Sequence, residues 1–394
     1  MHQSLEVIFK TVEACNCNCS YCYYFGNNDR YFKHKDKKIV SEDTIKEIAH
    51  FLKQGVKSLD LGLIRIIFHG GEPLLQKKSD FDKMCDIFTK ELSSCTEIQL
   101  GVQTNGTLIT KGWCDLFNKY KIGPSISIDG PKKCHNAYRV NHIGKGTYDD
   151  VVNGIKLVQK HTKKHTFCPG TLTVINPEFS AKEIYRHFSD DLQLTFMDFL
   201  LPHLNHNTFP LYQQRTKLTI DDYGNYICDL FDEWVKDNNP EIDIRILKII
   251  MRLLAGVKYT YLADFGPAPL IDMLPIITIN HDGSLSPDDS YITTREGILS
   301  TGFTVNNTTL NDFIKLPIFE EIKNIRKIIP DECLPCQWVK ICNGGFSITR
   351  YSAENGFNNP SIYCSAFKKI YMHIATYMIT HGLALSKLYN ILFE

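Results

Sequence analysis

Cysteine residues crowd into two short stretches of this 394-residue chain. The first stretch, "CNCNCSYCYY", holds Cys15, Cys19 and Cys22 in the spacing C-x3-C-x2-C. Three thiolates on one short loop can bind three irons of a [4Fe–4S] cluster and leave its fourth iron open to a substrate or cofactor. Crowded thiols also occur in structural zinc loops, which this spacing does not exclude. We interpret Cys17 as a spare thiol, although Cys17 with Cys19 or Cys22 would make another set of ligands.

The second stretch, "CLPCQWVKIC", supplies Cys333, Cys336 and Cys342, and Cys364 follows downstream. Four thiolates fill every external site of one [4Fe–4S] cluster. A four-cysteine zinc site is again the alternative. The other cysteines are scattered, and we expect most of them to be buried as small apolar side chains; they are Cys85, Cys95, Cys114, Cys134, Cys168 and Cys228.

The composition is that of a globular protein without a charged partner. Hydrophobic residues make up 43% of the chain, and 44 Lys and Arg residues balance 44 Asp and Glu residues. This balance gives no indication of binding to nucleic acid or to an anionic membrane surface. The N-terminal segment lacks an apolar signal region, and no apolar run approaches the ~20 residues of a membrane span. We therefore expect a cytoplasmic protein with reduced thiols, whose clustered cysteines bind metal.

Predicted strands and helices alternate from the N-terminus to about residue 200. The predicted strands cover residues 5–12, 63–71, 97–106, 122–131 and 168–176, and the helices cover 41–56, 81–92, 108–120 and 147–161. Each strand ends in Gly, Asn or Asp, and Ser41 is the expected N-cap of the first helix. Such βα repetition predicts an α/β fold with a parallel sheet, whose chemistry lies at the carboxyl ends of the strands.

The pattern changes after residue 205. Two helices are expected over 221–236 and 244–257, followed by a hairpin around Asp282 and Gly283. The cysteine-rich tail begins at Cys333, and a last helix begins near residue 365. We therefore divide the chain into residues 1–205, a helical connecting region 206–272, and a C-terminal domain 273–394.

Polar motifs follow the predicted strands in a fixed order: "CNCNCSYCYY", "FHGGEPLL" (68–75), "VQTNGTLI" (102–109), "SIDGP" (127–131) and "AYRVNHIGKGTYDDV" (137–151). In this order the motifs resemble those of the radical S-adenosylmethionine (SAM) superfamily, over roughly residues 5–205. The resemblance implies a partial (β/α)6 barrel. It also implies a [4Fe–4S] cluster on Cys15, Cys19 and Cys22 that binds SAM through its open iron.

The glycine-rich motif and its neighbours are the implied SAM site. Gly70 and Gly71 would let the methionine moiety of SAM approach the backbone. Glu72 would accept a hydrogen bond from its ammonium group.

The remaining implied SAM contacts come from three other motifs. Asn105 would lie near the sulfonium or ribose, while Ser127 and Arg139 would contact the ribose and the carboxylate. Tyr21 would lie against the adenine, and Asp129 is interpreted as a turn residue.

The cysteine-rich tail resembles the SPASM extension of radical SAM enzymes that modify peptides and proteins. That extension usually holds two auxiliary clusters, but here Phe346 and Asp288 stand where further cysteines are expected. The resemblance therefore implies one auxiliary [4Fe–4S] cluster with four cysteine ligands, Cys333, Cys336, Cys342 and Cys364. Its closed coordination favours electron transfer or a structural role.

Two further segments, "DFLLPH" (198–203) and "NGGFSITRYSAENGFNNPSIYC" (343–364), resemble the Xye-like maturases of ribosomally made peptides. That resemblance implies removal of a β-hydrogen and a new bond to an aromatic ring two residues away, which gives a three-residue cyclophane. An external donor would supply electrons. Asp289 is the candidate base, although a solvated turn carboxylate is an equal interpretation. Further polar candidates are His203, His206 and Arg350.

Other readings stay open. The same machinery could form a thioether, epimerise a residue, or oxidise Cys or Ser as sulfatase maturation does. A non-catalytic zinc-binding protein is the alternative from another class. We expect no separate leader-binding domain before residue 5, so the precursor peptide would pair with an exposed strand edge or be delivered by another protein.

Overall fold

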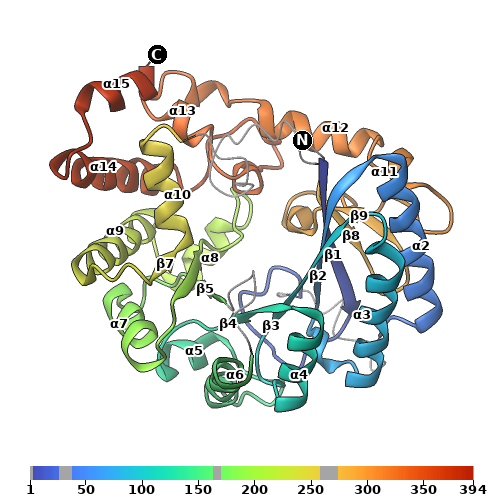
Figure 1. Ribbon diagram of the computed structural model, residues 1–394. Helices are drawn as coiled ribbons and strands as arrows, with labels where there is room; N and C mark the ends of the chain where they lie inside the picture. Colours follow the sequence, from blue (N-terminus) through green and yellow to red (C-terminus); the bar gives the residue numbers. More distant parts are fainter. Residues whose placement is uncertain (1–2, 26–37, 163–169, 258–273, 394) are drawn as a thin grey trace.

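A computed structural model describes residues 3–25, 38–162, 170–257 and 274–393. Its strands curve around a central space, with helices α2, α3, α4, α6, α7 and α9 on the outer side (Figure 1). The strands of the described residues form one sheet in the order β7-β6-β5-β4-β3-β2-β1-β8-β9. Their bounds are Gln3–Val12 (β1), Leu61–Gly70 (β2), Glu97–Thr104 (β3), Gly123–Ser127 (β4), Gly170–Val174 (β5), Phe196–Leu200 (β6), Asp243–Ile244 (β7), Ile277–Ile279 (β8) and Leu285–Pro287 (β9).

Parallel pairing joins every pair of neighbours from β7 to β8, and only β8 and β9 are antiparallel within this sheet. The predicted α/β fold with a parallel sheet is therefore confirmed. On β1, Val7 and Phe9 are fully buried and lie in register with Ile66 and Phe68 of β2. The carboxyl ends of β1 to β6 lie at one edge, where the polar motifs follow them.

The helices that follow β1 to β5 cover the outer face of the sheet with their apolar sides. Ser41 caps the first of them, because its side chain accepts a hydrogen bond from the backbone N–H of Thr44. Ile48 and Leu52 of that helix are fully buried. The bounds are Glu42–Ser58 (α2), Lys78–Leu92 (α3), Lys111–Tyr120 (α4), Lys132–Tyr138 (α5), Tyr148–His161 (α6) and Ala181–Arg186 (α7).

The second half of the chain adds helices around a short hairpin. The predicted hairpin is confirmed as β8 and β9, and Gly283 in its turn has a φ of 81°. The remaining helices are Phe209–Thr216 (α8), Ile220–Asp237 (α9), Arg245–Leu254 (α10), Leu310–Phe313 (α11), Pro317–Lys327 (α12), Val339–Cys342 (α13), Cys364–Thr380 (α14) and Leu385–Phe393 (α15). Helices α9, α10 and α14 lie together at one side of the molecule (Figure 1).

One hydrophobic core joins the two halves, because it contains both Phe9 of β1 and Phe367 of α14. The division at residues 205 and 272 stays a prediction. Among the scattered cysteines, Cys85, Cys114, Cys134 and Cys228 are buried and Cys95 is half-buried, while Cys168 lies outside the described residues. No helix in the described ranges is both long enough and apolar enough to span a membrane.

Candidate active site and metal centres

The first cysteine loop lies at the carboxyl end of β1. Cys15, Cys19 and Cys22 are all half-buried and free of disulfides. The sulfur of Cys15 accepts from the side-chain amide of Asn105 at 3.7 Å, and that of Cys19 accepts from Arg139 at 3.9 Å. N–H donors aimed at thiolate sulfurs are the surroundings that a cluster needs, so these residues fit an iron–sulfur group.

Cys17 is 3% exposed and does not point away from this loop. Hydrogen bonding to the Cys15 and Cys19 thiols raises the pKa of Cys17, and its contact with Cys19 lowers the pKa of Cys19 to about 7. Cys17 therefore touches two of the predicted cluster ligands. Its interpretation as a spare thiol stays a prediction.

The glycine turn after β2 packs directly on the cysteine loop. The backbone N–H of Gly71 donates to the carbonyl of Val12, and that of Glu72 donates to Ala14, both at 2.8 Å. A side-chain carbon at Gly71 would lie 2.1 Å from the Ala14 oxygen, and one at Gly70 would lie 2.4 Å from the Val12 oxygen. Both glycines are therefore required by the protein's own backbone, and their contact with SAM stays a prediction.

Glu72 is fully buried and joins the ends of β2 and β3. One of its carboxylate oxygens accepts from the Thr104 hydroxyl at 2.7 Å and the Leu74 N–H at 3.0 Å, and the other accepts from the Asn105 N–H at 2.7 Å. Burial raises the pKa of Glu72 to about 7, against the opposing effect of these hydrogen bonds. A cationic ligand nearby would stabilise its ionised form.

Asp129 does more than form a turn. Its side chain accepts from the Tyr21 hydroxyl, from Arg139 Nε at 2.9 Å and from the Val174 N–H at 3.2 Å. The Arg139 guanidinium also lies 5.4 Å from the centre of the Tyr21 ring. Asp129 therefore positions two of the predicted SAM-binding residues, which the sequence interpretation missed. A third, Ser127, accepts from Gln103 at 3.1 Å beside the end of β4.

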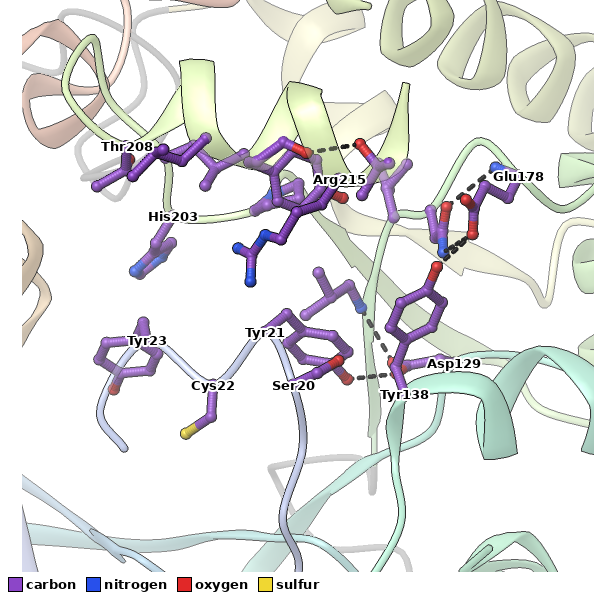
Figure 2. Close-up of a pocket in the computed structure, with 18 of the residues that line it drawn as sticks. Ser20, Tyr21, Cys22, Tyr23, Asp129, Tyr138, Glu178, His203, Thr208 and Arg215 are labelled. Atoms are coloured by element: carbon purple, nitrogen blue, oxygen red, sulfur yellow. Dashed lines mark hydrogen bonds between the residues drawn. The ribbon is translucent and has the colours of Figure 1, made fainter. Parts of the chain in front are cut away.

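A pocket of about 490 Å³ opens beside the cysteine loop, beneath helix α8 (Figure 2). Its lining comes from that loop, from the ends of β4 and β5, from the segment after β6 and from α8. Figure 2 shows the side chain of Arg215 reaching down from α8 toward Tyr21. Other lining residues include Ser20, Cys22, Tyr23, Tyr138, Glu178, His203 and Thr208.

Of the three further polar candidates, His203 alone lies in this pocket. Its ring centre is 4.9 Å from that of Tyr23. His206 instead donates through Nε2 to the Pro360 carbonyl at 2.9 Å. Arg350 lies apart, in the C-terminal part of the chain.

Asp289 is not a solvated turn carboxylate, and that interpretation is wrong. It is 6% exposed, lies 2.7 Å from the Lys10 ammonium, and accepts from the Tyr23 hydroxyl at 3.0 Å. The same ammonium lies 3.2 Å from the centre of the Tyr24 ring. Burial alone raises the pKa of Asp289, but Lys10, His69 and the hydrogen bonds lower it to about 2. Asp289 is therefore ionised at neutral pH and reaches the pocket wall through Tyr23.

The second cysteine set converges on one cavity. A space of about 120 Å³ is lined by Cys333, Cys336, Cys342 and Cys364, together with Gly344 and Tyr371. This donor set fits a [4Fe–4S] cluster with four thiolates. Within the described part of the chain, no three His, Cys, Asp or Glu side chains are placed to hold a single metal ion.

The two positions that depart from the SPASM pattern are filled by other interactions. Asp288 pairs with Arg326 at 3.0 Å. The Phe346 ring lies 5.9 Å from that of His203. Neither side chain supplies the thiolate that the pattern expects.

Comparison with known proteins identifies the family to which the N-terminal part of this chain is similar. The model of the Radical SAM superfamily matches residues 9–186. This part of the chain is a radical SAM domain. The predicted superfamily is thereby confirmed, and the protein is a radical SAM enzyme.

Its relatives extend over nearly the whole chain. A cysteine-type anaerobic sulfatase-maturating enzyme of Clostridium perfringens is 26% identical over 379 residues, covering 93% of this chain and 95% of the relative. A serine-type enzyme of Bacteroides thetaiotaomicron is 25% identical over 399 residues, covering 95% and 90%. The solved structure of native anSMEcpe with bound AdoMet superposes with a TM-score of 0.79, at 22% identity over 96% of this chain and 99% of the other. These names correspond to the Cys or Ser oxidation alternative, and the cyclophane subgroup is not among them.

Proposed function

We propose that this radical SAM enzyme matures a ribosomally made peptide by removing a hydrogen atom from a β-carbon and bonding that carbon to an aromatic ring. The observation that carries the β-hydrogen chemistry of this proposal is the ionised carboxylate of Asp289, held by Lys10 behind Tyr23 at the pocket wall. A β-carbon radical that has added to an aromatic ring must lose one electron and one proton before the ring is aromatic again. The site therefore needs a proton acceptor, and Asp289 supplies it.

When bound, a [4Fe–4S] cluster and SAM supply a 5′-deoxyadenosyl radical, which takes a hydrogen atom from an unactivated carbon. Cys15, Cys19 and Cys22 would hold the cluster. Asp129 accepts from the Tyr21 hydroxyl and from Arg139, and Asp129 and Arg139 together hold the Tyr21 ring at the pocket. The aromatic lining excludes water from the reacting carbon; it includes Tyr23, Tyr138, Phe179, His203 and Tyr212.

The two segments that resemble the cyclophane subgroup meet beside this pocket. The Tyr363 hydroxyl donates to the Pro202 carbonyl at 2.9 Å, and the Phe346 ring centre lies 5.9 Å from that of His203. Pro202 and its neighbour His203 both line the pocket. This joint placement supports a common role of the two segments in holding the peptide.

Oxidation of a Cys or Ser side chain to an aldehyde is the second candidate, and the names of the relatives support it. It begins with the same removal of a β-hydrogen and needs a proton acceptor in the same place. Asp289 therefore serves both reactions, and the product distinguishes them.

The proposed partners follow from this chemistry. The substrate is a precursor peptide, and an external donor delivers the electron that starts each turnover. Cys333, Cys336, Cys342 and Cys364 would hold the auxiliary cluster, which would provide an acceptor for the electron that leaves the substrate. The balanced charge of the chain is consistent with a cytoplasmic enzyme that binds neither nucleic acid nor a membrane surface.

Co-expression with the candidate precursor peptide, followed by tandem mass spectrometry, tests the proposal. We expect loss of two hydrogens and no fragmentation between the two joined residues. Oxidation of Ser also removes two hydrogens, but its aldehyde reacts with an aminooxy probe and leaves fragmentation intact. An unchanged mass with altered stereochemistry would indicate epimerisation and contradict the proposal.

A further inference from the structure

Arg350 is a buried cation whose hydrogen bonds all go to neutral groups. It is 1% exposed and ends the 3-10 turn Ser347–Arg350. Its guanidinium donates to the carbonyls of Ile325 at 3.1 Å, Ile328 at 2.9 Å and Phe357 at 2.8 and 3.0 Å. Across the residues that the structure describes, no carboxylate lies within ion-pair distance of it.

Other deeply buried cations of this protein have a carboxylate. Lys10 lies 2.7 Å from Asp289, and Arg139 lies 2.9 Å from Asp129. Carbonyl groups satisfy hydrogen bonds, but they do not neutralise a charge. A buried charge without a counter-charge is strongly unfavourable, so Arg350 requires an anion close to it.

The acidic groups that act on the charge of Arg350 are the Cys333 thiol, the Tyr291 hydroxyl and the Cys342 thiol, and the two thiols belong to the auxiliary site. Gly344 lines the cavity of the four cysteines, and a side-chain carbon placed there would lie 3.7 Å from Arg350 Nε. The guanidinium thus lies behind the glycine backbone that forms the cavity wall. Burial raises the pKa of the Cys333 thiol, and the charge of Arg350 opposes that rise.

We propose that Arg350 is the buried counter-charge of the auxiliary cluster and raises its reduction potential. This inference rests on the proposed cluster at Cys333, Cys336, Cys342 and Cys364. A cluster with four thiolates is anionic, and reduction adds one more negative charge. A nearby buried cation therefore stabilises the reduced form more than the oxidised form. The cluster then accepts an electron from the substrate more readily.

A purely structural role for Arg350 has a different signature. Ile325 and Ile328 lie at the C-terminal end of α12, where a guanidinium fork also satisfies exposed carbonyls. Lys keeps the positive charge but cannot reproduce the fork, and Gln keeps some hydrogen bonding without the charge. The two substitutions therefore separate charge from hydrogen bonding.

The test compares Arg350→Gln and Arg350→Lys in the full-length protein with Cys15, Cys19 and Cys22 replaced by Ala, so that the auxiliary cluster alone gives a signal. Iron and sulfide are quantified after anaerobic reconstitution, and the midpoint potential is measured by redox titration followed by electron paramagnetic resonance. Lys368→Gln is the control, because it removes an exposed cation at the same cavity. The titration is repeated with the three N-terminal cysteines present.

We expect a clearly lower potential for Arg350→Gln, a potential close to that of the parent for Arg350→Lys, and little change for Lys368→Gln. An unchanged potential in a fully loaded Arg350→Gln protein would overturn the inference. Equal decreases in both Arg350 variants would also overturn it, because hydrogen bonding rather than charge would be responsible. Absence of a cluster in the parent would instead refute the auxiliary cluster itself, and leave the N-terminal site untouched.

Discussion

Lys10 determines the chemical state of Asp289. An isolated buried carboxylate favours its protonated form, yet the pKa of Asp289 is lowered to about 2 because the Lys10 ammonium is 2.7 Å away and Tyr23 donates to the same oxygen. Asp289 can therefore accept a proton at neutral pH. A low pKa also makes it a weak base, so proton transfer must occur when the substrate proton has become acidic.

Asp289→Asn should separate SAM cleavage from product formation. The amide cannot accept the substrate proton, so we expect peptide modification to fall by about 100-fold or more, while 5′-deoxyadenosine still forms. Chromatography of deoxyadenosine and mass spectrometry of the peptide measure the two steps. Asp282→Asn, in the hairpin turn, is the matched control and should retain both. Normal product from Asp289→Asn would remove Asp289 from the mechanism.

Lys10→Met should destabilise the protein in a pH-dependent manner. Since the pKa of Asp289 is lowered to about 2, the pair contributes stability above pH ~4 that is lost as the pH falls toward about 2. Without Lys10, burial raises that pKa above its usual value, and stability then decreases as the pH rises through it. At neutral pH we expect a loss of about 3–5 kcal/mol.

Chemical denaturation of the Lys10→Met protein at several pH values measures this effect. Adding Asp289→Asn should recover part of the stability, because no buried charge is then left unpaired. Lys38→Met removes an exposed partner of Glu13 and should cost less than about 1 kcal/mol. If Lys10→Met lowers the free energy of unfolding as little as Lys38→Met does, the Lys10–Asp289 pair does not stabilise the protein as argued.

Candidate functional residues were easier to predict from the sequence than the residues that contact them. Asp289 was a candidate base, but its burial depends on Lys10, which is 279 positions earlier in the chain. One signal for Lys10 was present, because a lysine directly follows the apolar run Val7, Ile8 and Phe9 within the strand. Asp129 gave no such signal, since an Asp before Gly is usual in turns. Its contacts with Tyr21 and Arg139 exist only once the strand ends meet.

At the scale of elements, the glycine turn after β2 and the cysteine loop after β1 form one unit. Gly71→Ala would place a carbon 2.1 Å from the Ala14 oxygen, so the cysteine loop must shift. We expect loss of most iron from the N-terminal site and loss of deoxyadenosine formation. Gly112→Ala in α4 meets the flexible end of Lys78 and, at ordinary contact distance, the Thr110 hydroxyl, so it should behave as wild type. An unchanged iron content in the Gly71→Ala protein would show that the position of the cysteine loop does not depend on the glycine turn.

Regular elements were the most predictable part of the fold. The first strands and helices follow the predicted ranges within a few residues, because their apolar periodicity is determined locally. The pairing of β8 with β1 was not predictable, since it joins segments more than 260 positions apart. Short helices such as α8, which has no buried residue, carry little periodic signal and were missed.

At the scale of the whole molecule, one sheet and one core connect the two predicted metal sites. The hairpin β8–β9 extends the sheet beyond β1 and brings Asp289 against Tyr23 behind the pocket wall, while the core packs α14, which begins at Cys364, against α9. The auxiliary site is therefore fixed relative to the cysteine loop by shared packing. This arrangement allows an electron to leave the substrate toward a rigidly placed acceptor.

Metal content tests this arrangement. Two [4Fe–4S] clusters predict about eight irons per chain with equal sulfide after anaerobic purification. Replacement of Cys15, Cys19 and Cys22 by Ala should leave about four irons and abolish deoxyadenosine formation, because the open iron is lost. Cys333→Ala should also leave about four irons but retain SAM cleavage, since the N-terminal site is intact. Zinc without sulfide would instead support the alternative of a non-catalytic zinc-binding protein. Cleavage of SAM by the variant that lacks Cys15, Cys19 and Cys22 would show that SAM binds elsewhere.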